Sequence, residues 1–242
     1  MLRRSTEPML KLRRKLREYQ LMIIRYLKAE RKFSKIEVFE QRSSVGGLWN
    51  YTSLNALDKE FTIPRTQPTK LPDTVIRTGN SPEAQFISPV YEFLETNIPH
   101  SLMNYSDQRF PETVALFPSH RVVKDYLEAY ADEIRPIISL STQVLGVRKV
   151  QTEKKMSWEV EVLDLKTNQR RCEEFDAVMI CSGHYNDPFI PEIKGLAEFN
   201  RMHPGCISHS KFYRRPDQYT NKVGWLMKLC CMIGSVPETD LS

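Results

Sequence analysis

The sequence predicts an α/β fold that joins a parallel β-sheet to a β-hairpin. Three features of the 242 residues lead to this prediction. An amphipathic stretch at 9–33 runs almost directly into a β-branched and aromatic stretch at 35–41, as in half of an α/β crossover unit. Residues 142–150 and 157–165 alternate apolar and polar side chains, which is typical of a half-exposed antiparallel pair. Residues 174–183 contain the apolar run AVMIC, which indicates a strand buried on both faces.

The first predicted element is a helix over 9–33, followed by a strand over 35–41. Apolar side chains of the helix recur at helical spacing: Leu12, Leu16, Tyr19, Met22, Ile23, Tyr26 and Leu27. Residues 1–34 hold eleven Lys or Arg and three Glu, a net charge of +8, which leaves −3 of the overall +5 for the rest. We therefore expect a basic helical leader over 1–20 and a body with no electrostatic reason to bind nucleic acid.

The next part of the chain, 52–117, scatters prolines and aromatic residues without a period. An irregular stretch of this length inside a compact domain is typical of a functional wall. A helix is then predicted over 119–134, with Ser119 at its N-cap and an apolar stripe of Val122, Tyr126, Leu127 and Tyr130.

Five cysteines are present, and none has the spacing of a metal site. Free thiols indicate a reducing, cytoplasmic compartment. The Arg-rich start MLRRSTEPMLKLRRKLR has some features of a mitochondrial presequence, so a mitochondrial location is an alternative. A basic amphipathic leader is also compatible with peripheral contact to an anionic membrane.

A dinucleotide site is suggested by residues 38–51, VFEQRSSVGGLWNY. Glu40 closes the predicted strand, where a carboxylate can accept hydrogen bonds from a ribose. Gly46 and Gly47 let the backbone approach a ligand that a Cβ would exclude. The other interpretation is that the glycines only form a turn and that Trp49 fills the core.

Two later segments have a similar character. The run 174–183 ends in Ser182-Gly183 and is followed by a proline-containing crossing. Further on, Gly205, His209 and Tyr213 are spaced at intervals of four. Each pattern alone also fits an ordinary strand end or a structural histidine.

Taken together, these segments resemble the flavin-containing monooxygenase family from about Leu21 to Val223. The resemblance is carried, in the family's order, by EVFEQRSSVGGLWNY, YEFLETNIPHSLMNYSDQRFP, FPSHRVVKDYLEAYADEI, FDAVMICSGHYNDPFIPEIKG and HSKFY. The last lies in a segment similar to the family pattern F-x-G-x-x-x-H-x-x-x-[F/Y], with His203 in place of the first Phe.

The resemblance implies an FAD-binding Rossmann-like domain and an enzyme of the N,N-dimethylaniline-type flavin monooxygenase class. NADPH would reduce FAD, O₂ would form the C4a-hydroperoxide, and oxygen would pass to a soft nitrogen or sulfur of a small molecule. Asn97 would act beside the flavin as the catalytic residue. The implied cofactor-binding residues are Glu40, Gly46, Gly47, Leu48, Trp49, Thr96, Val144, Ser182, Gly183, Gly205, Ser208, His209, Ser210 and Tyr213.

Both glycine-rich dinucleotide turns of the family are missing from these residues. No G-x-G-x-x-G occurs, and no glycine precedes Gly46, although a diphosphate needs such a turn of amides. We therefore expect an incomplete FAD-binding domain over 21–200, the start of a truncated NADPH-binding domain over 201–242, and an inactive or impaired enzyme. The alternative is a non-catalytic isoform that interacts with a partner through its basic N-terminus.

Overall fold

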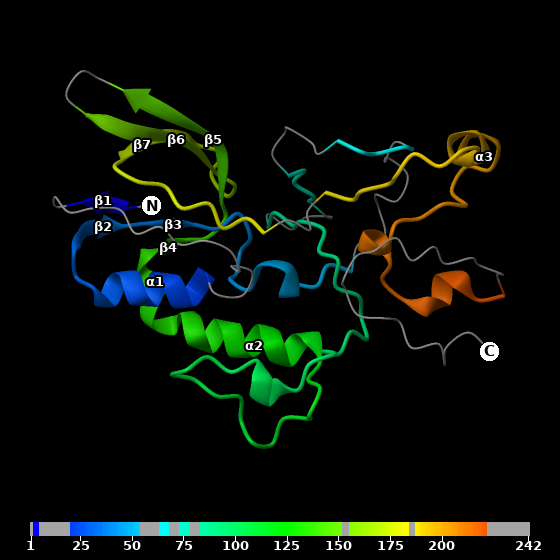
Figure 1. Cartoon of the computed structure of the whole chain (residues 1–242), viewed down its shortest axis with the longest axis horizontal. Helices are drawn as coiled ribbons and strands as arrows, with labels where there is room; N and C mark the ends of the chain where they lie inside the picture. Colours follow the sequence, from blue (N-terminus) through cyan, green and yellow to red (C-terminus); the bar gives the residue numbers. More distant parts are fainter. Residues whose placement is uncertain are drawn as a thin grey trace.

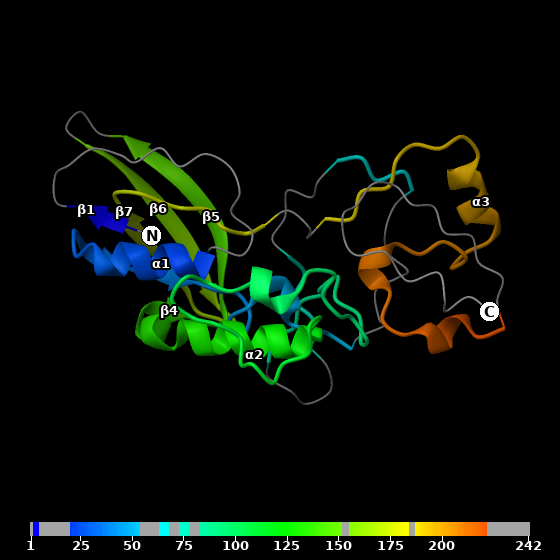
Figure 2. The same ribbon diagram turned by 60° about the horizontal axis from the view of Figure 1, so that its bottom comes forward.

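A computed structural model describes residues 2–4, 20–53, 63–67, 73–77, 83–151, 155–183 and 187–221. The fold is mixed α/β, with one small parallel sheet and two small antiparallel sheets. Helices α1 and α2 lie side by side on one side of the strands, and the segment with α3 lies at the other end of the molecule (Figure 1). The same arrangement is visible in the turned view (Figure 2). In the described part of the chain, no helix has the length and apolar character needed to cross a bilayer.

The N-terminal elements are the strand β1 (Leu2–Arg4), the helix α1 (Gln20–Ala29) and the strand β2 (Phe33–Ile36). The predicted extension of the helix to residue 33 is wrong, because the chain turns at Arg31 with a positive φ of 52° and continues as β2. Leu2–Arg4 pair antiparallel with β2, which a helical leader did not predict. The remainder of the predicted leader, 5–19, lies outside the described residues.

The strand predicted over 35–41 is divided into two short strands with different partners. After β2, the strand β3 (Val38–Phe39) pairs in parallel with β4 (Ile138–Ser139). The pairing continues past β3, since Glu40 N–H donates to Ser139 O at 3.0 Å and Thr142 N–H donates to Glu40 O at 2.9 Å. Glu40 therefore follows the carboxyl end of a parallel strand.

The helix predicted over 119–134 is confirmed as α2 (His120–Ala131), which continues into the 3₁₀ helix η3 (Asp132–Ile137). Ser119 occupies the N-cap position, but its side chain makes no capping hydrogen bond. The buried face of α2 packs on an aromatic cluster whose closest ring pair is Phe110 and Tyr126, stacked at 3.9 Å. Leu21 and Met22 of α1 pack against the same cluster, which fixes α1 beside α2.

The predicted hairpin is confirmed as β5 (Thr142–Gln151) and β6 (Met156–Asp164), joined by a third antiparallel strand, β7 (Arg170–Phe175). The strand predicted over 174–183 is wrong beyond Phe175. Met179 and Ile180 are 38% and 76% exposed, and no strand among the described residues pairs with 178–183. Without a neighbouring strand and a second covering layer, an apolar run does not become a buried strand.

The remaining described segments are mostly irregular, as predicted for 52–117. They contain the 3₁₀ helices η1 (Gly47–Trp49), η2 (His100–Leu102), η4 (Ser210–Phe212) and η5 (Pro216–Tyr219), and the helix α3 (Leu196–Met202). Isolated bridges tie distant segments together, including Arg65 to Ile190 and Glu95 to Ser119.

Candidate functional site

Glu40 is held at the end of the parallel pair with its carboxylate turned onto the following loop. Oε1 accepts the N–H of Arg42 at 2.9 Å. Burial raises the pKa of Glu40, although the Arg42 amide and charge oppose that rise. A carboxylate has about four acceptor positions, so this group can accept further hydrogen bonds from a polyol such as ribose.

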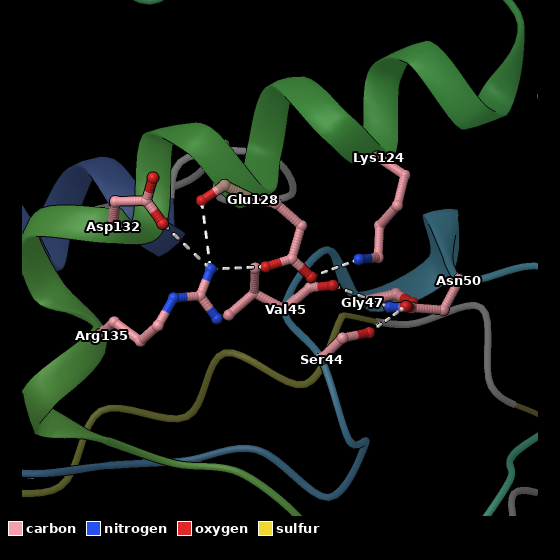
Figure 3. Close-up of polar contacts among 8 residues, drawn as sticks. All are labelled: Ser44, Val45, Gly47, Asn50, Lys124, Glu128, Asp132 and Arg135. Carbon is pink, nitrogen blue, oxygen red and sulfur yellow. Dashed lines mark hydrogen bonds and ion pairs between the residues drawn. The ribbon is translucent and has the colours of Figure 1, made fainter.

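The glycine loop, residues 44–50, follows directly and is fixed by its own side chains (Figure 3). Asn50 Nδ2 donates to Val45 O and to Gly47 O, each at 3.0 Å, and Ser44 Oγ donates to Asn50 Oδ1 at 2.6 Å. Gly46 and Gly47 have positive φ values of 98° and 49°, which favour glycine. Trp49 packs on the aromatic cluster under α2, and Leu48 O accepts the hydroxyl of Ser88.

Both interpretations of this loop from sequence therefore have support in the structure. The glycines form a turn and Trp49 joins the core, as the structural interpretation requires. A Cβ placed on Gly47 would have no atom within 4 Å, so the backbone also faces open space there.

Thr96 and Asn97 lie near the N-terminal end of α2. Thr96 N–H donates to Pro118 O at 3.0 Å, and its hydroxyl donates to Ile98 O at 2.9 Å. Asn97 is exposed. The structure thus places the predicted catalytic amide on the surface of the loop that precedes α2.

Val144 lies on β5 and packs, half-buried, in the core of the hairpin with Phe175. The neighbouring residue Gln143 connects this strand to the segment after Glu40. Gln143 Nε2 donates to Asp73 O at 2.9 Å and to Gln41 Oε1 at 3.4 Å. Val144 is therefore brought close to the Glu40 segment.

The later predicted residues lie in two other places. Ser182 and Gly183 are exposed in the coil after β7, and Gly183 has a φ of +68°. In the HSKFY segment, His209 Nδ1 accepts the N–H of Lys211 at 3.1 Å. Ser210 in this segment is exposed, as are Gly205 and Ser208 just before it.

The HSKFY segment is attached to the rest of the molecule by Arg214 and Tyr213. Arg214 is 1% exposed, and its guanidinium donates to Tyr213 O at 2.7 Å and Lys211 O at 2.9 Å. The Tyr213 ring contacts the Tyr91 ring at 5.3 Å, and Glu92 N–H donates to Arg214 O at 3.0 Å. Burial lowers the pKa of Lys211.

Sequence patterns did not indicate the roles of Arg214, Asn50 or Lys124. Lys124 of α2 lies over Gly46, and its partner Glu128 follows it by four residues. The spacing of Lys124 and Glu128 was visible in the sequence. Their position over the glycine loop was not, because a contact across so many residues leaves no local pattern.

A cavity of about 370 Å³ lies elsewhere, between Ile63-Pro64 and the segment from Glu192 to Ala197. None of the residues predicted from the sequence lines it. No group of three or more His, Cys, Asp or Glu within the described ranges is arranged to hold a metal ion.

The fit of this site to a flavin dinucleotide is partial. Glu40 and the open face of Gly47 suit the ribose and a close backbone approach. The diphosphate, in contrast, requires a turn of amides at a helix N-terminus, and these 242 residues contain no G-x-G-x-x-G.

Comparisons with known proteins identify relatives of the chain. The chain is 33% identical over 199 residues to the flavin-containing monooxygenase FMO GS-OX5 of Arabidopsis thaliana, covering 78% of this chain and 38% of that protein. It is 26% identical over 214 residues to the flavin-containing monooxygenase ustF2 of Aspergillus flavus, covering 43% of that protein. The chain thus spans about two fifths of the length of these relatives.

A solved structure and a family model complete the comparison. The crystal structure of Tmm from Pelagibacter sp. strain HTCC7211 matches with a TM-score of 0.57 and 24% identity, covering 84% of this chain and 41% of that one, which shows a shared fold. The model of flavin-binding monooxygenase-like proteins matches residues 78–235, more than half of the chain. The chain therefore belongs to the flavin-binding monooxygenase-like family.

Proposed function

We propose that this chain forms the adenosine-ribose half of a flavin-dinucleotide site, with Glu40 as the ribose acceptor. The observation that carries the proposal is a half-buried carboxylate at the carboxyl end of a parallel strand, followed along the chain by a glycine whose Cβ position is open. Ligands of open α/β sheets bind at this end of the strands. Ribose hydroxyls would donate to Glu40 and favour its charged form, which opposes the effect of burial.

The family relationship extends the proposal to the chemistry. When bound, FAD would carry electrons from NADPH to O₂ and oxidise a soft nitrogen or sulfur of a small-molecule substrate. In this proposal Asn97 and Thr96 lie on the wall above the flavin. Gly205, Ser208, His209, Ser210 and Tyr213 lie where an NADPH-binding domain begins.

We also propose that the 242 residues do not catalyse this reaction by themselves. Neither diphosphate has a glycine-rich turn of amides to bind it. The lysine nearest the glycine loop does not replace that turn, because its ammonium group is engaged by Glu128. Weak FAD binding without turnover is the expected behaviour.

The ribose role is tested by titrating FAD into the wild type and the Glu40→Gln variant. A hydrogen bond to a charged acceptor is worth about 1.5–3 kcal/mol, so we expect E40Q to weaken FAD affinity by at least about tenfold. Glu112→Gln, at an exposed turn, serves as the matched control and should bind as the wild type does. Equal affinities of the wild type and E40Q would contradict the ribose role.

The lack of turnover is tested separately. Purified chain supplied with FAD and NADPH should show no oxygen uptake above that of free FAD and NADPH. A bound flavin absorbance that survives gel filtration, together with NADPH-dependent oxygen uptake, would show that the isolated chain is a competent enzyme.

A further inference from the structure

The two glycines of the glycine loop have different surroundings. A Cβ placed on Gly46 would lie 2.8 Å from Lys124 Cδ and 3.3 Å from Lys124 Cε. The same atom placed on Gly47 would meet nothing within 4 Å. One glycine is therefore packed against the stem of a lysine from α2, whereas the other faces open space.

Lys124 is held over Gly46 by a chain of ion pairs along the helix (Figure 3). Its Nζ contacts Glu128 Oε1, and Glu128 Oε2 accepts Arg135 Nη2 at 2.6 Å. Burial opposes the ionisation of Glu128, but hydrogen bonds from Lys124 and Arg135 outweigh it and lower its pKa. Arg135 Nη2 also lies 3.3 Å from Asp132 Oδ1.

This cluster lacks the properties of a phosphate site. Lys124, Arg135, Glu128 and Asp132 sum to zero charge, and each cation is engaged by a carboxylate. The Lys124 side chain is only 19% exposed. Lys124 therefore acts at the loop through its methylene chain, which the ion pair with Glu128 holds against Gly46.

The other sides of the loop are also occupied. The side-chain amide of Asn50 donates hydrogen bonds to the carbonyl oxygens of Val45 and Gly47 inside the loop. Val45 is 3% exposed and packs with Ala131 and Ile134. Gly47 is therefore the position of the glycine pair at which the backbone remains accessible to a ligand.

We propose that Lys124 is a positioning residue that closes the Gly46 face of the loop, so that Gly47 is the glycine approached by a dinucleotide. The role of Lys124 stands on packing alone, whereas the role of Gly47 rests on the flavin-binding function proposed above. The proposal differs from the sequence-based expectation that both glycines line the cofactor, and that expectation stays a prediction.

The packing role is tested by a double-mutant cycle in urea. Gly46→Ala should lower the unfolding midpoint more than Gly47→Ala, because it collides with Lys124 and because its φ of 98° lies further from the left-handed region than the 49° of Gly47. In a Lys124→Ala background the cost of G46A should become smaller, whereas the cost of G47A should not change. In a Lys124→Met background, which keeps the stem without the charge, the larger cost should remain. Additive effects of G46A and K124A would overturn the packing role.

If G46A does not fold, amide hydrogen exchange decides the same question on K124A and K124M. Removal of the stem should accelerate exchange at the amides of Trp49 and Asn50, which donate to Gly46 O and Gly47 O, whereas K124M should exchange like the wild type. Unchanged exchange in K124A would overturn the proposal.

The ligand role is tested by FAD titration of the same variants. G47A should weaken FAD affinity by about tenfold or more, and G46A/K124A by clearly less. Equal losses would overturn the assignment to Gly47. If the wild type binds no FAD, the flavin-binding function and the Gly47 role both fail, and the urea cycle still decides the role of Lys124.

Discussion

His120, the first residue of α2, is a buried histidine whose ionisation should affect stability. Its Nε2 lies 3.1 Å from Glu92 O, and its ring contacts Tyr51 at 5.4 Å. Burial lowers the pKa of His120 below its ordinary value of 6.5, Arg121 adds to this effect, and the Glu92 carbonyl and carboxylate oppose it. Folding therefore favours the neutral ring.

The sign of the resulting pH dependence follows from linkage. The unfolded chain binds a proton at His120 more readily than the folded chain, so stability is intact above pH 6.5 and declines as the pH falls through this value towards the folded pKa. Urea midpoints measured between neutral and mildly acidic pH should fall more steeply for the wild type than for His120→Gln. The exposed His203→Gln variant should follow the wild type. A parallel pH profile for H120Q would exclude this role.

At the residue scale, the sequence predicted what local patterns encode. The position of Glu40 at a strand end and the turn at the two glycines follow from position and residue type. The difference between Gly46 and Gly47 does not, because it depends on Lys124, which is distant along the chain. The burial of Arg214 was equally invisible, since a charged residue is rarely expected in a core.

At the element scale, the β5–β7 sheet is joined to the N-terminal strands by an aromatic pair and a surface charge network. Phe39 and Phe175 meet edge to face at 6.2 Å, and Phe175 is 1% exposed. Nearer the surface, Lys35 Nζ lies 3.0 Å from Glu173 Oε2. The Lys35 side chain is 49% exposed and the Glu173 side chain is 24% exposed. Exposed ion pairs contribute about 0–1 kcal/mol, so the aromatic contact should dominate.

This ranking predicts unequal effects of two substitutions. Phe175→Ala should lower the free energy of unfolding by about 3–5 kcal/mol because it leaves a cavity in the core. Glu173→Gln should lower it by less than about 1 kcal/mol, and high salt should remove the difference. Equilibrium denaturation measures both. A larger loss for E173Q than for F175A would reverse the ranking.

The elements themselves were predicted unevenly, for physical reasons. The periodicity at 119–134 and the alternation at 142–165 are strong, and both produced the expected elements. The run AVMIC was misjudged because apolar character alone does not supply a pairing strand. The end of α1 was misjudged because Arg31 adopts a left-handed turn without the glycine that normally marks one.

At the scale of the whole molecule, the charge distribution separates the leader from the body. Residues 5–19 lie outside the described residues, so a role in docking stays a prediction, as does the cytoplasmic, mitochondrial or membrane-peripheral location. Replacing Arg13, Arg14, Lys15 and Arg17 by Gln should abolish cosedimentation with anionic vesicles, since each basic residue contributes about 1 kcal/mol at such a surface.

Two comparisons make this vesicle experiment specific. The variant Lys149→Gln/Lys166→Gln removes exposed charges from the body and should sediment as the wild type does. Uncharged vesicles should bind neither protein. Equal sedimentation of the leader variant and the wild type would remove the membrane contact from consideration.

Family membership was also predicted from sequence, because five short segments in a fixed order are more specific than any one of them. The family model and the relatives confirm it. The reaction of a whole monooxygenase does not follow from membership, since the chain covers 38% of the first of these relatives.

The contact between Lys124 and Gly46 also constrains how this protein can vary. The two positions belong to different elements, yet the room at one is set by the length of the side chain at the other. The φ of 98° already favours glycine at position 46, so a larger residue there should require both a different loop conformation and a short side chain at position 124.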